Sequence, residues 1–202
     1  MLYKVVFSVL AIVLSLPSAA LAVDDRQEGW VSGIPAIRKA PPGGDFTLQS
    51  VAGPVSLQDF RGKLVLLYFG YTSCPDVCPT SLSLVTQALN ELSEDELKEI
   101  QAIFISVDPK RDTPEVLARY VGYFHPNLIG VTGTELEVAE VAQLYGAQYY
   151  EVEMEGSAFG YSVNHSSVTY LITPEGTLRF IFPHATPASV IVEAIEFLLA
   201  GD

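Results

Sequence analysis

The sequence predicts an α/β fold in which a mixed central β-sheet is flanked by helices. Three observations lead to this prediction. From residue 45 onward, apolar runs of strand length alternate with segments of helical period, and two of the runs are apolar throughout, as in strands buried on both faces. The last third reads as an antiparallel hairpin followed by a helix, so the sheet should be mixed rather than wholly parallel.

The composition limits the classes of function. The 202 residues include 11 Lys and Arg against 24 Asp and Glu, and a net charge of -13 would repel a phosphate backbone, so we expect no binding to nucleic acid. The 2 cysteines are too few for a disulfide-rich fold or for a zinc site made of cysteines alone. A hydrophobic fraction of 49% supplies enough core for one compact domain.

The first 22 residues have the three regions of a secretory signal peptide. Lys4 precedes an apolar run over 5–16, and Ala20 with Ala22 forms the small-residue pattern of a cleavage site. The alternative, an uncleaved inner-membrane anchor, needs the longer stretch 5–23, because the shorter run cannot span a bilayer. Both readings predict a periplasmic or exported protein whose membrane contact is limited to such an anchor.

Residues 23–44 contain repeated Pro and Gly and predict a flexible or extended segment. The domain itself is expected over 45–202. It should begin with an N-terminal β-hairpin, formed by residues 45–49 and 51–55 around Gly53.

The first buried strand is predicted at residues 63–71, which are almost continuously apolar. A helix with Pro79 in its first turn should follow, because four apolar residues recur at helical spacing. They are Leu82, Val85, Leu89 and Leu92. A capping box opens a short helix at 93–97, and residues 102–107 predict the second buried strand.

The remaining elements repeat this order and then end in a hairpin and a helix. A Thr-Pro pair and a second capping box mark the starts of two further helices. The predicted elements are a helix at 113–123, a strand at 128–131, a helix at 134–146, strands at 149–153, 168–172 and 177–182, and a helix at 186–199. The helix at 134–146 runs through the apolar residues Leu136, Ala139, Val141 and Leu144.

The chemistry concentrates where the first buried strand meets its helix, the place where ligands bind in open sheets of this kind. Cys74 and Cys78 lie there, four residues apart, so their thiols could reach one metal ion or each other. A helix N-terminus stabilises thiolate over thiol and raises reactivity. The alternative role is a structural disulfide that only staples the loop.

Three segments stand out: Cys-Pro-Asp-Val-Cys-Pro at 74–79, Ser-Val-Asp-Pro-Lys-Arg-Asp-Thr-Pro at 106–114 and Val-Asn-His at 163–165. In that order, they resemble the copper-site motif, the second signature and the histidine loop of the Sco/SenC family, which are thioredoxin-like copper chaperones associated with assembly of respiratory oxidases. The resemblance covers roughly residues 45–199 with the three motifs in the family's order.

The resemblance implies a thioredoxin-like fold with Cys74, Cys78 and His165 as copper ligands. It also implies a copper recipient, namely a cytochrome oxidase subunit at its copper A site or another copper protein, with another periplasmic copper chaperone or a thiol reductant as further partners. Soft thiolates select Cu(I) and imidazole accepts Cu(I) and Cu(II), so such a site could hold either oxidation state. Three protein ligands leave a position open through which a partner's ligand could enter.

Other polar residues are weaker candidates. Asp76, Asp108 and Asp112 could orient groups around the site or a docking partner, or Asp108 and Asp112 could serve only the turn and cap between strand and helix. We expect surface roles for His125 and His184. Met154 is expected in a loop rather than as a copper ligand.

The main functional alternative is a thiol-disulfide reductase that uses Cys74 and Cys78 as its redox pair and keeps the cysteines of the copper recipient reduced. Two departures from thioredoxin enzymes count against it: three residues separate the cysteines, and no proline lies between Pro126 and Pro174 to serve as the cis-proline. A peroxiredoxin-like peroxidase is disfavoured because Pro75 stands where that family has Thr. A purely structural domain is disfavoured by His165 and by the position of the cysteines.

Overall fold

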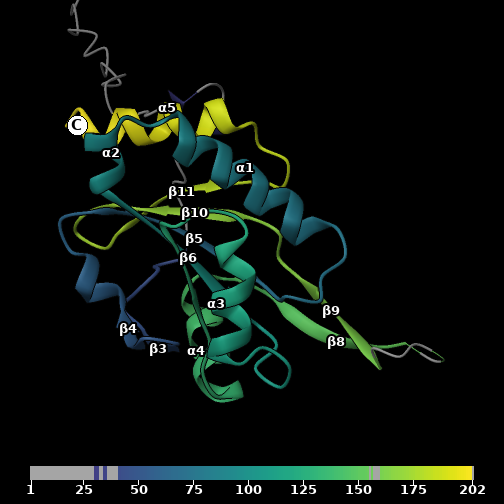
Figure 1. Ribbon diagram of the computed structural model, residues 1–202. Coiled ribbons are helices and arrows are strands. Elements are labelled where there is room, and N and C mark those ends of the chain that lie inside the picture. The colour runs from purple at the N-terminus through teal and green to yellow at the C-terminus, as the bar shows by residue number, and fades with distance from the viewer. Residues whose placement is uncertain (1–29, 32–33, 36–40, 155, 157–159, 202) are drawn as a thin grey trace, which may run out of the picture.

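The computed structural model describes residues 30–31, 34–35, 41–154, 156 and 160–201. A five-stranded sheet lies at its centre, in the order β11-β10-β5-β6-β7 (Figure 1). Its strands are β5 (Leu64–Gly70), β6 (Ile100–Ser106), β7 (Leu128–Val131), β10 (Thr169–Ile172) and β11 (Leu178–Phe182). This confirms the predicted mixed sheet.

The register explains why the central strand is apolar throughout. β5 pairs in parallel with β6 and antiparallel with β10, and all seven of its residues are buried. β6 pairs in parallel with β7, and β11 completes the opposite edge antiparallel to β10. A strand that has neighbours on both edges and helices on both faces can keep no polar face, so Val, Leu and aromatic residues fill it.

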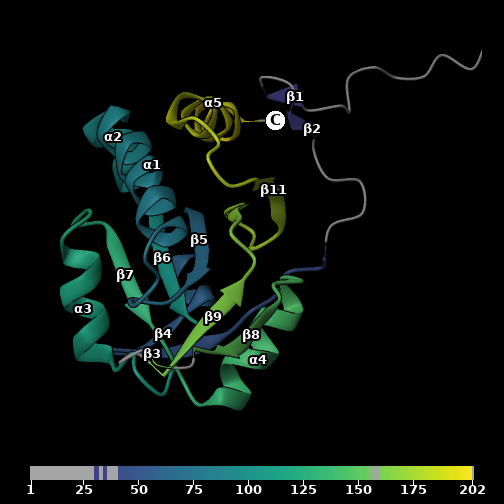
Figure 2. The same ribbon diagram turned by 90° about the vertical axis from the view of Figure 1, so that its right-hand side faces the viewer.

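Helices cover the two faces of this sheet. α1 (Val77–Glu91) and α5 (Ala188–Leu199) pack side by side over one face, and α4 (Glu135–Leu144) lies across the other (Figures 1 and 2). α3 (Pro114–Gly122) packs on β7, and the short α2 (Glu94–Lys98) precedes β6. The described part of the chain contains no helix with the length and apolar content that a bilayer crossing requires.

The helix starts were predicted more accurately than the buried faces. Both capping boxes form, at Ser93 and Thr134, and Thr113 caps α3. Of the apolar residues on which the α4 prediction rested, Val141 is buried, but Leu136 is 69% exposed and Ala139 is exposed as well. The helix turns Val138, Val141 and Ala142 toward the core.

The N-terminal hairpin is confirmed as β3 (Thr47–Ser50) paired with β4 (Gly53–Ser56), followed by a short 3-10 helix, η2 (Leu57–Phe60). Before it, β1 (Trp30–Val31) pairs with β2 (Ile34–Pro35) and lies next to α5 (Figure 2).

The signal peptide predicted at 1–22 and most of the extended segment predicted at 23–44 fall outside the described residues, and both stay predictions. The end of that segment is fastened to the domain, because the Gly43 N–H donates to the Leu144 carbonyl at 3.1 Å and the Tyr145 hydroxyl donates to the Gly44 carbonyl at 2.8 Å.

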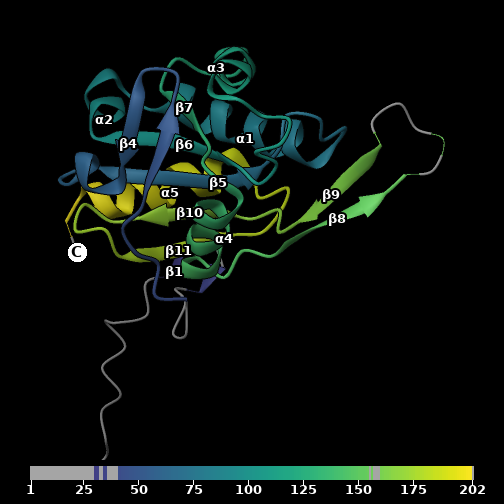
Figure 3. The ribbon, with the colours of Figure 1, turned by 90° about the horizontal axis from the view of Figure 1, so that it is seen from below.

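A second hairpin, formed by β8 (Tyr149–Glu153) and β9 (Tyr161–His165), projects from the sheet (Figure 3). The sequence predicted β8 but not β9. The residues Tyr-Ser-Val-Asn-His show only a short alternation, and they become a strand by pairing with β8. His165 is therefore the last residue of a strand rather than part of a loop.

Candidate metal centre

The loop between β5 and α1 carries one cysteine and the first turn of α1 carries the other. The Cys74 N–H donates to the Tyr71 carbonyl at 3.2 Å, which closes a turn after the strand. Cys78 is the second residue of α1, and its N–H points at the Cys74 sulfur at 3.5 Å. The predicted position at the strand-to-helix junction is confirmed, and neither cysteine is in a disulfide.

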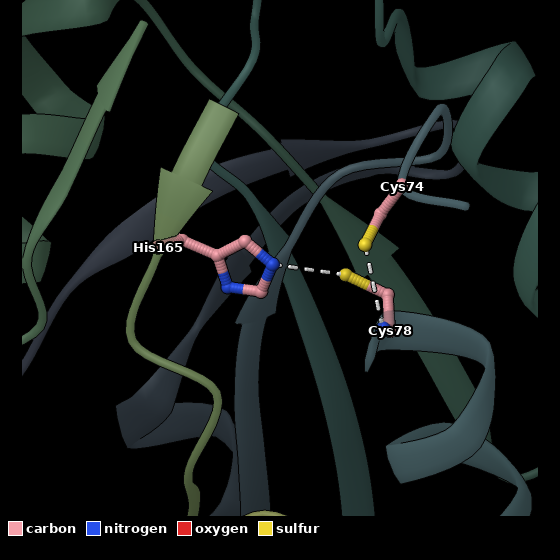
Figure 4. Close-up of side chains that lie close together, drawn as sticks. All are labelled: Cys74, Cys78 and His165. Carbon is pink, nitrogen blue, oxygen red and sulfur yellow. Dashed lines mark hydrogen bonds between the residues drawn. The ribbon is translucent and has the colours of Figure 1, made fainter. Parts of the chain in front are cut away.

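His165 reaches this pair from the end of β9 (Figure 4). Its Nε2 lies 3.2 Å from the Cys78 sulfur, and its Nδ1 lies 3.0 Å from the Ser166 carbonyl oxygen. Because a carbonyl only accepts, Nδ1 carries the proton and Nε2 presents a lone pair toward the sulfurs. The ligand atoms of Cys74, Cys78 and His165 all lie within 4.8 Å of one another.

Aromatic rings hold the imidazole in place. Tyr68 and Tyr71 contact it edge-on, with ring centroids 6.2 Å and 5.8 Å away and interplanar angles of 86° and 90°. Neither tyrosine was predicted as part of the site. The only available signal was their place in and just after the buried strand that leads to Cys74.

The two cysteines differ in access. Cys78 is 0% exposed, whereas Cys74 is 8% exposed and lines a cleft of about 1010 Å³. The cleft lies between the cysteine loop and the β8–β9 hairpin, and His165 and Arg111 also line it. A ligand carried by another molecule can therefore approach Cys74 and His165 from solvent.

The pKa values of the two cysteines are shifted in opposite directions. The Cys78 thiol donates a hydrogen bond to the Cys74 sulfur and lowers the pKa of Cys74 to about 3, with further help from backbone N–H groups against the cost of burial. The same interaction with Cys74, together with burial, raises the pKa of Cys78. The site thus combines a thiolate at the cleft with a thiol behind it, and a soft cation bound to both sulfurs would displace one proton.

Asp112 supports the cysteine loop directly. Its carboxylate is fully buried and accepts hydrogen bonds from the Thr72 N–H at 2.9 Å, the Thr72 hydroxyl at 2.6 Å and the Ser106 hydroxyl at 2.6 Å. The helix cap belongs to Thr113 instead. Asp112 therefore joins the loop before Cys74 to the end of β6.

Asp108 faces the hairpin that carries the histidine. It is 2% exposed, accepts a hydrogen bond from the Tyr161 hydroxyl at 2.7 Å and forms an ion pair with Arg111. Arg111 also stacks on Tyr161 and donates to its carbonyl, a role that the charged sequence around it did not reveal. Asp76, by contrast, is exposed and makes no side-chain cap hydrogen bond at the start of α1.

The other two histidines lie away from the cluster. His184 is exposed, as predicted, with its Nδ1 3.1 Å from the Ser81 hydroxyl. The surface role predicted for His125 was wrong, because the residue is 7% exposed and its Nδ1 accepts the Asn127 N–H at 3.0 Å. Met154 lies just beyond β8, is 44% exposed and lines the cleft.

The SCO1/SenC family model matches residues 35–200. The chain belongs to the SCO1/SenC family. It is 41% identical over 169 residues to the mitochondrial SCO2 homolog of Bos taurus, which covers 82% of this chain and 63% of that protein, so the chain spans less than two thirds of this relative. It is 44% identical over 155 residues to an SCO2-like protein of Rickettsia prowazekii, covering 76% of this chain and 75% of that protein.

Solved structures of SCO1/SenC relatives share the fold. A crystal structure of Arabidopsis thaliana ScoI with copper bound superimposes with a TM-score of 0.73 at 35% identity, covering 79% of this chain and 99% of that chain. This confirms the thioredoxin-like fold implied by the motifs. Two sulfurs and one imidazole nitrogen are also a donor set that suits copper, so Cys74, Cys78 and His165 form a candidate copper site.

Proposed function

We propose that this protein is a copper carrier that binds one copper ion through Cys74, Cys78 and His165 and delivers it to the copper A site of a respiratory oxidase. The observation that carries the proposal is the convergence of the three ligand atoms within 4.8 Å. The copper-bound Arabidopsis relative supports the identity of the metal.

The small number of protein ligands and the open cleft favour transfer of copper over its storage. Three protein ligands leave a coordination position open, and the cleft beside Cys74 gives a partner's ligand access to it. Copper can then move by ligand exchange, with a new bond formed before each old bond breaks. An exported location, through the segment 1–22, would place the carrier beside periplasmic or membrane-bound recipients.

Copper loading of the reduced protein tests the ligand set. We expect one copper per chain and a sulfur-to-Cu(II) charge-transfer absorption, both lost in Cys78→Ser and strongly weakened in His165→Ala. His184→Ala is the matched control, because this histidine lies outside the cluster. Copper binding in Cys78→Ser and His165→Ala equal to wild type would show that the ligand assignment is wrong.

Delivery needs a separate experiment. The loaded protein is mixed with the soluble copper A domain of an oxidase in its reduced form, the two are separated, and copper is measured in each. Copper should appear in the domain faster than from a small-molecule chelator of equal affinity. Equal rates would contradict directed delivery while leaving copper binding intact.

The Cys74 thiolate, which lines the cleft, supports a second candidate, a thiol-disulfide reductase. Cys74 would attack a disulfide of the recipient to form a mixed disulfide, and Cys78 would then attack the Cys74 sulfur, releasing the recipient as a dithiol and leaving this protein oxidised by two electrons. A Cys78→Ser variant should trap the mixed disulfide. Failure of the reduced wild type to reduce the recipient would exclude this role.

A further inference from the structure

Tyr68 carries a buried hydroxyl that the fold alone does not explain. The residue is 2% exposed in the middle of β5, and its hydroxyl is one of the buried polar atoms that have no hydrogen-bond partner among the described residues. Its ring stacks on Phe104, with centroids 6.2 Å apart, and contacts His165 edge-on. A phenylalanine would make the same ring contacts without burying an unpaired donor, so the hydroxyl calls for a separate explanation.

The ring that carries this hydroxyl lies beside the candidate copper site. Gly70, two residues further along β5, shows the closeness: a Cβ there would be 2.7 Å from the Cys78 sulfur and 3.1 Å from Cε1 of Tyr68. Burial raises the pKa of Tyr68, and the charge of Cys78 raises it further, so the group stays a donor. The polar side chains that act on it at short range are Cys78 and Ser81.

Copper binding would change the charge and the hydrogen bonding of the Cys78 sulfur. Its sulfur is fully buried and has His165 Nε2 as a neighbour at 3.2 Å. When copper takes up that nitrogen and the Cys78 proton leaves, the sulfur becomes an anion without access to water. Anionic acceptors form much stronger hydrogen bonds than neutral thiols do. A neighbouring hydroxyl donor would therefore stabilise the Cys78 thiolate in the copper-bound state.

We infer that Tyr68 is a positioning residue of this site, whose hydroxyl donates a hydrogen bond to the Cys78 thiolate when copper is bound. The inference rests on the proposed function. A hydrogen bond to a ligating thiolate withdraws charge from the sulfur, so it stabilises Cu(I) more than Cu(II) and tunes the exchange of the metal.

A Tyr68→Phe variant of the full chain tests this inference. Without copper, its unfolding temperature should equal or exceed that of wild type, because an unpaired buried hydroxyl has been removed. With copper, its Cu(I) affinity should fall roughly tenfold, its reduction potential should fall, and its charge-transfer band should move to longer wavelength. A residue with a packing role alone would not change the band or the potential.

Tyr120→Phe is the matched control. Its hydroxyl is also buried without a partner among the described residues, but its ring packs against Phe104 and Phe124, whereas the ring of Tyr68 contacts His165. This variant should keep the wild-type band and potential. If Tyr68→Phe matches wild type in affinity, potential and band, the inference is overturned while the proposed function stands.

A measurement on the wild-type chain covers the case in which Tyr68→Phe does not fold. With tyrosines labelled at Cζ, the Tyr68 signal should shift when Cu(I) is added and should still shift in Ser81→Ala. No shift, or a shift lost in Ser81→Ala, would overturn the inference because the acceptor would not be Cys78. Absence of copper binding by wild type itself would overturn the proposed function and this inference with it.

Discussion

Arg111 lies over the ring of Tyr161, with its guanidinium carbon 3.8 Å from the ring centroid, and donates to the Tyr161 carbonyl at 2.9 Å. Arg111 follows β6, and Tyr161 opens the strand that ends at His165. Asp108 completes the junction by accepting hydrogen bonds from both residues. The strand that supplies the histidine is thus fixed to the same loop region whose Asp112 holds the cysteine loop.

Arg111→Ala should loosen this junction. It removes the stacking on Tyr161 and leaves the Asp108 carboxylate, 1% exposed, as a buried charge without its cation, which should destabilise the fold by about 3 kcal/mol. Denaturant unfolding measures the loss, and faster amide exchange at 161–165 should show where it acts. Copper affinity should fall as well, because His165 is held less firmly.

Lys110→Ala is the matched control, because Lys110 also bridges to the hairpin, through Glu151 at 2.6 Å, but both side chains are 47% exposed. Water solvates these charges equally well, so stability and copper affinity should barely change. If both variants lose the same stability, the buried junction is not what fixes the hairpin.

Gly70→Ala should disturb the site without straining the backbone. The added Cβ would lie 2.7 Å from the Cys78 sulfur and 2.8 Å from Cε2 of Phe104, so the sulfur must move. We expect a loss of about 1 to 3 kcal/mol in unfolding free energy from overpacking, together with weaker copper binding. Gly122→Ala, where a Cβ would meet nothing within 4 Å, should leave both properties unchanged or raise stability slightly.

Asp112→Asn replaces one acceptor of a buried carboxylate with a donor that faces the Thr72 and Ser106 donors. The cost should be about 2 kcal/mol, because hydrogen bonds to a charged acceptor are lost and a buried donor is left unpaired. Unfolding and copper dissociation rates should both rise. Asp76→Asn, at an exposed carboxylate, should change copper dissociation little, and a larger effect there would contradict the assignment of loop support to Asp112.

The buried His125 makes stability depend on pH. Burial lowers its pKa below the ordinary 6.5. At a pH between the two values, the unfolded chain binds a proton at this residue and the folded chain does not. The stabilisation is complete above pH 6.5 and is lost as pH falls through the folded pKa. Unfolding measured from pH 7 to pH 5 should show a smaller decline in His125→Gln, and an unchanged decline would show that other groups are responsible.

The sequence predicted best what local chemistry decides. Capping boxes at Ser93 and Thr134 marked helix starts, and the apolar run of β5 marked a strand buried on both faces. The cysteine positions and the histidine of the site also followed from motifs. Each of these patterns involves only a few neighbouring residues, so a single segment of the sequence is enough to predict the feature.

Features that depend on distant partners were missed. β9 forms by pairing with β8, His125 is buried by the elements that fold over it, and Arg111 finds Tyr161 across 50 residues of sequence. The sequence around each residue looks like ordinary polar loop. Only the tertiary fold supplies the neighbour that gives such a residue its role.

The difference in exposure between the two cysteines gives the site one side that faces the cleft and one side that is closed to solvent. Cys74, at the rim of the cleft, can meet an incoming ligand, whereas Cys78 has no exposed surface. In the proposed delivery, a recipient would displace the ligands at the cleft while the Cys78 sulfur still holds the ion, so that copper would not pass into solvent between the two proteins. The ligands would then leave in a fixed order, and the loss of the Cys78 sulfur would complete the transfer.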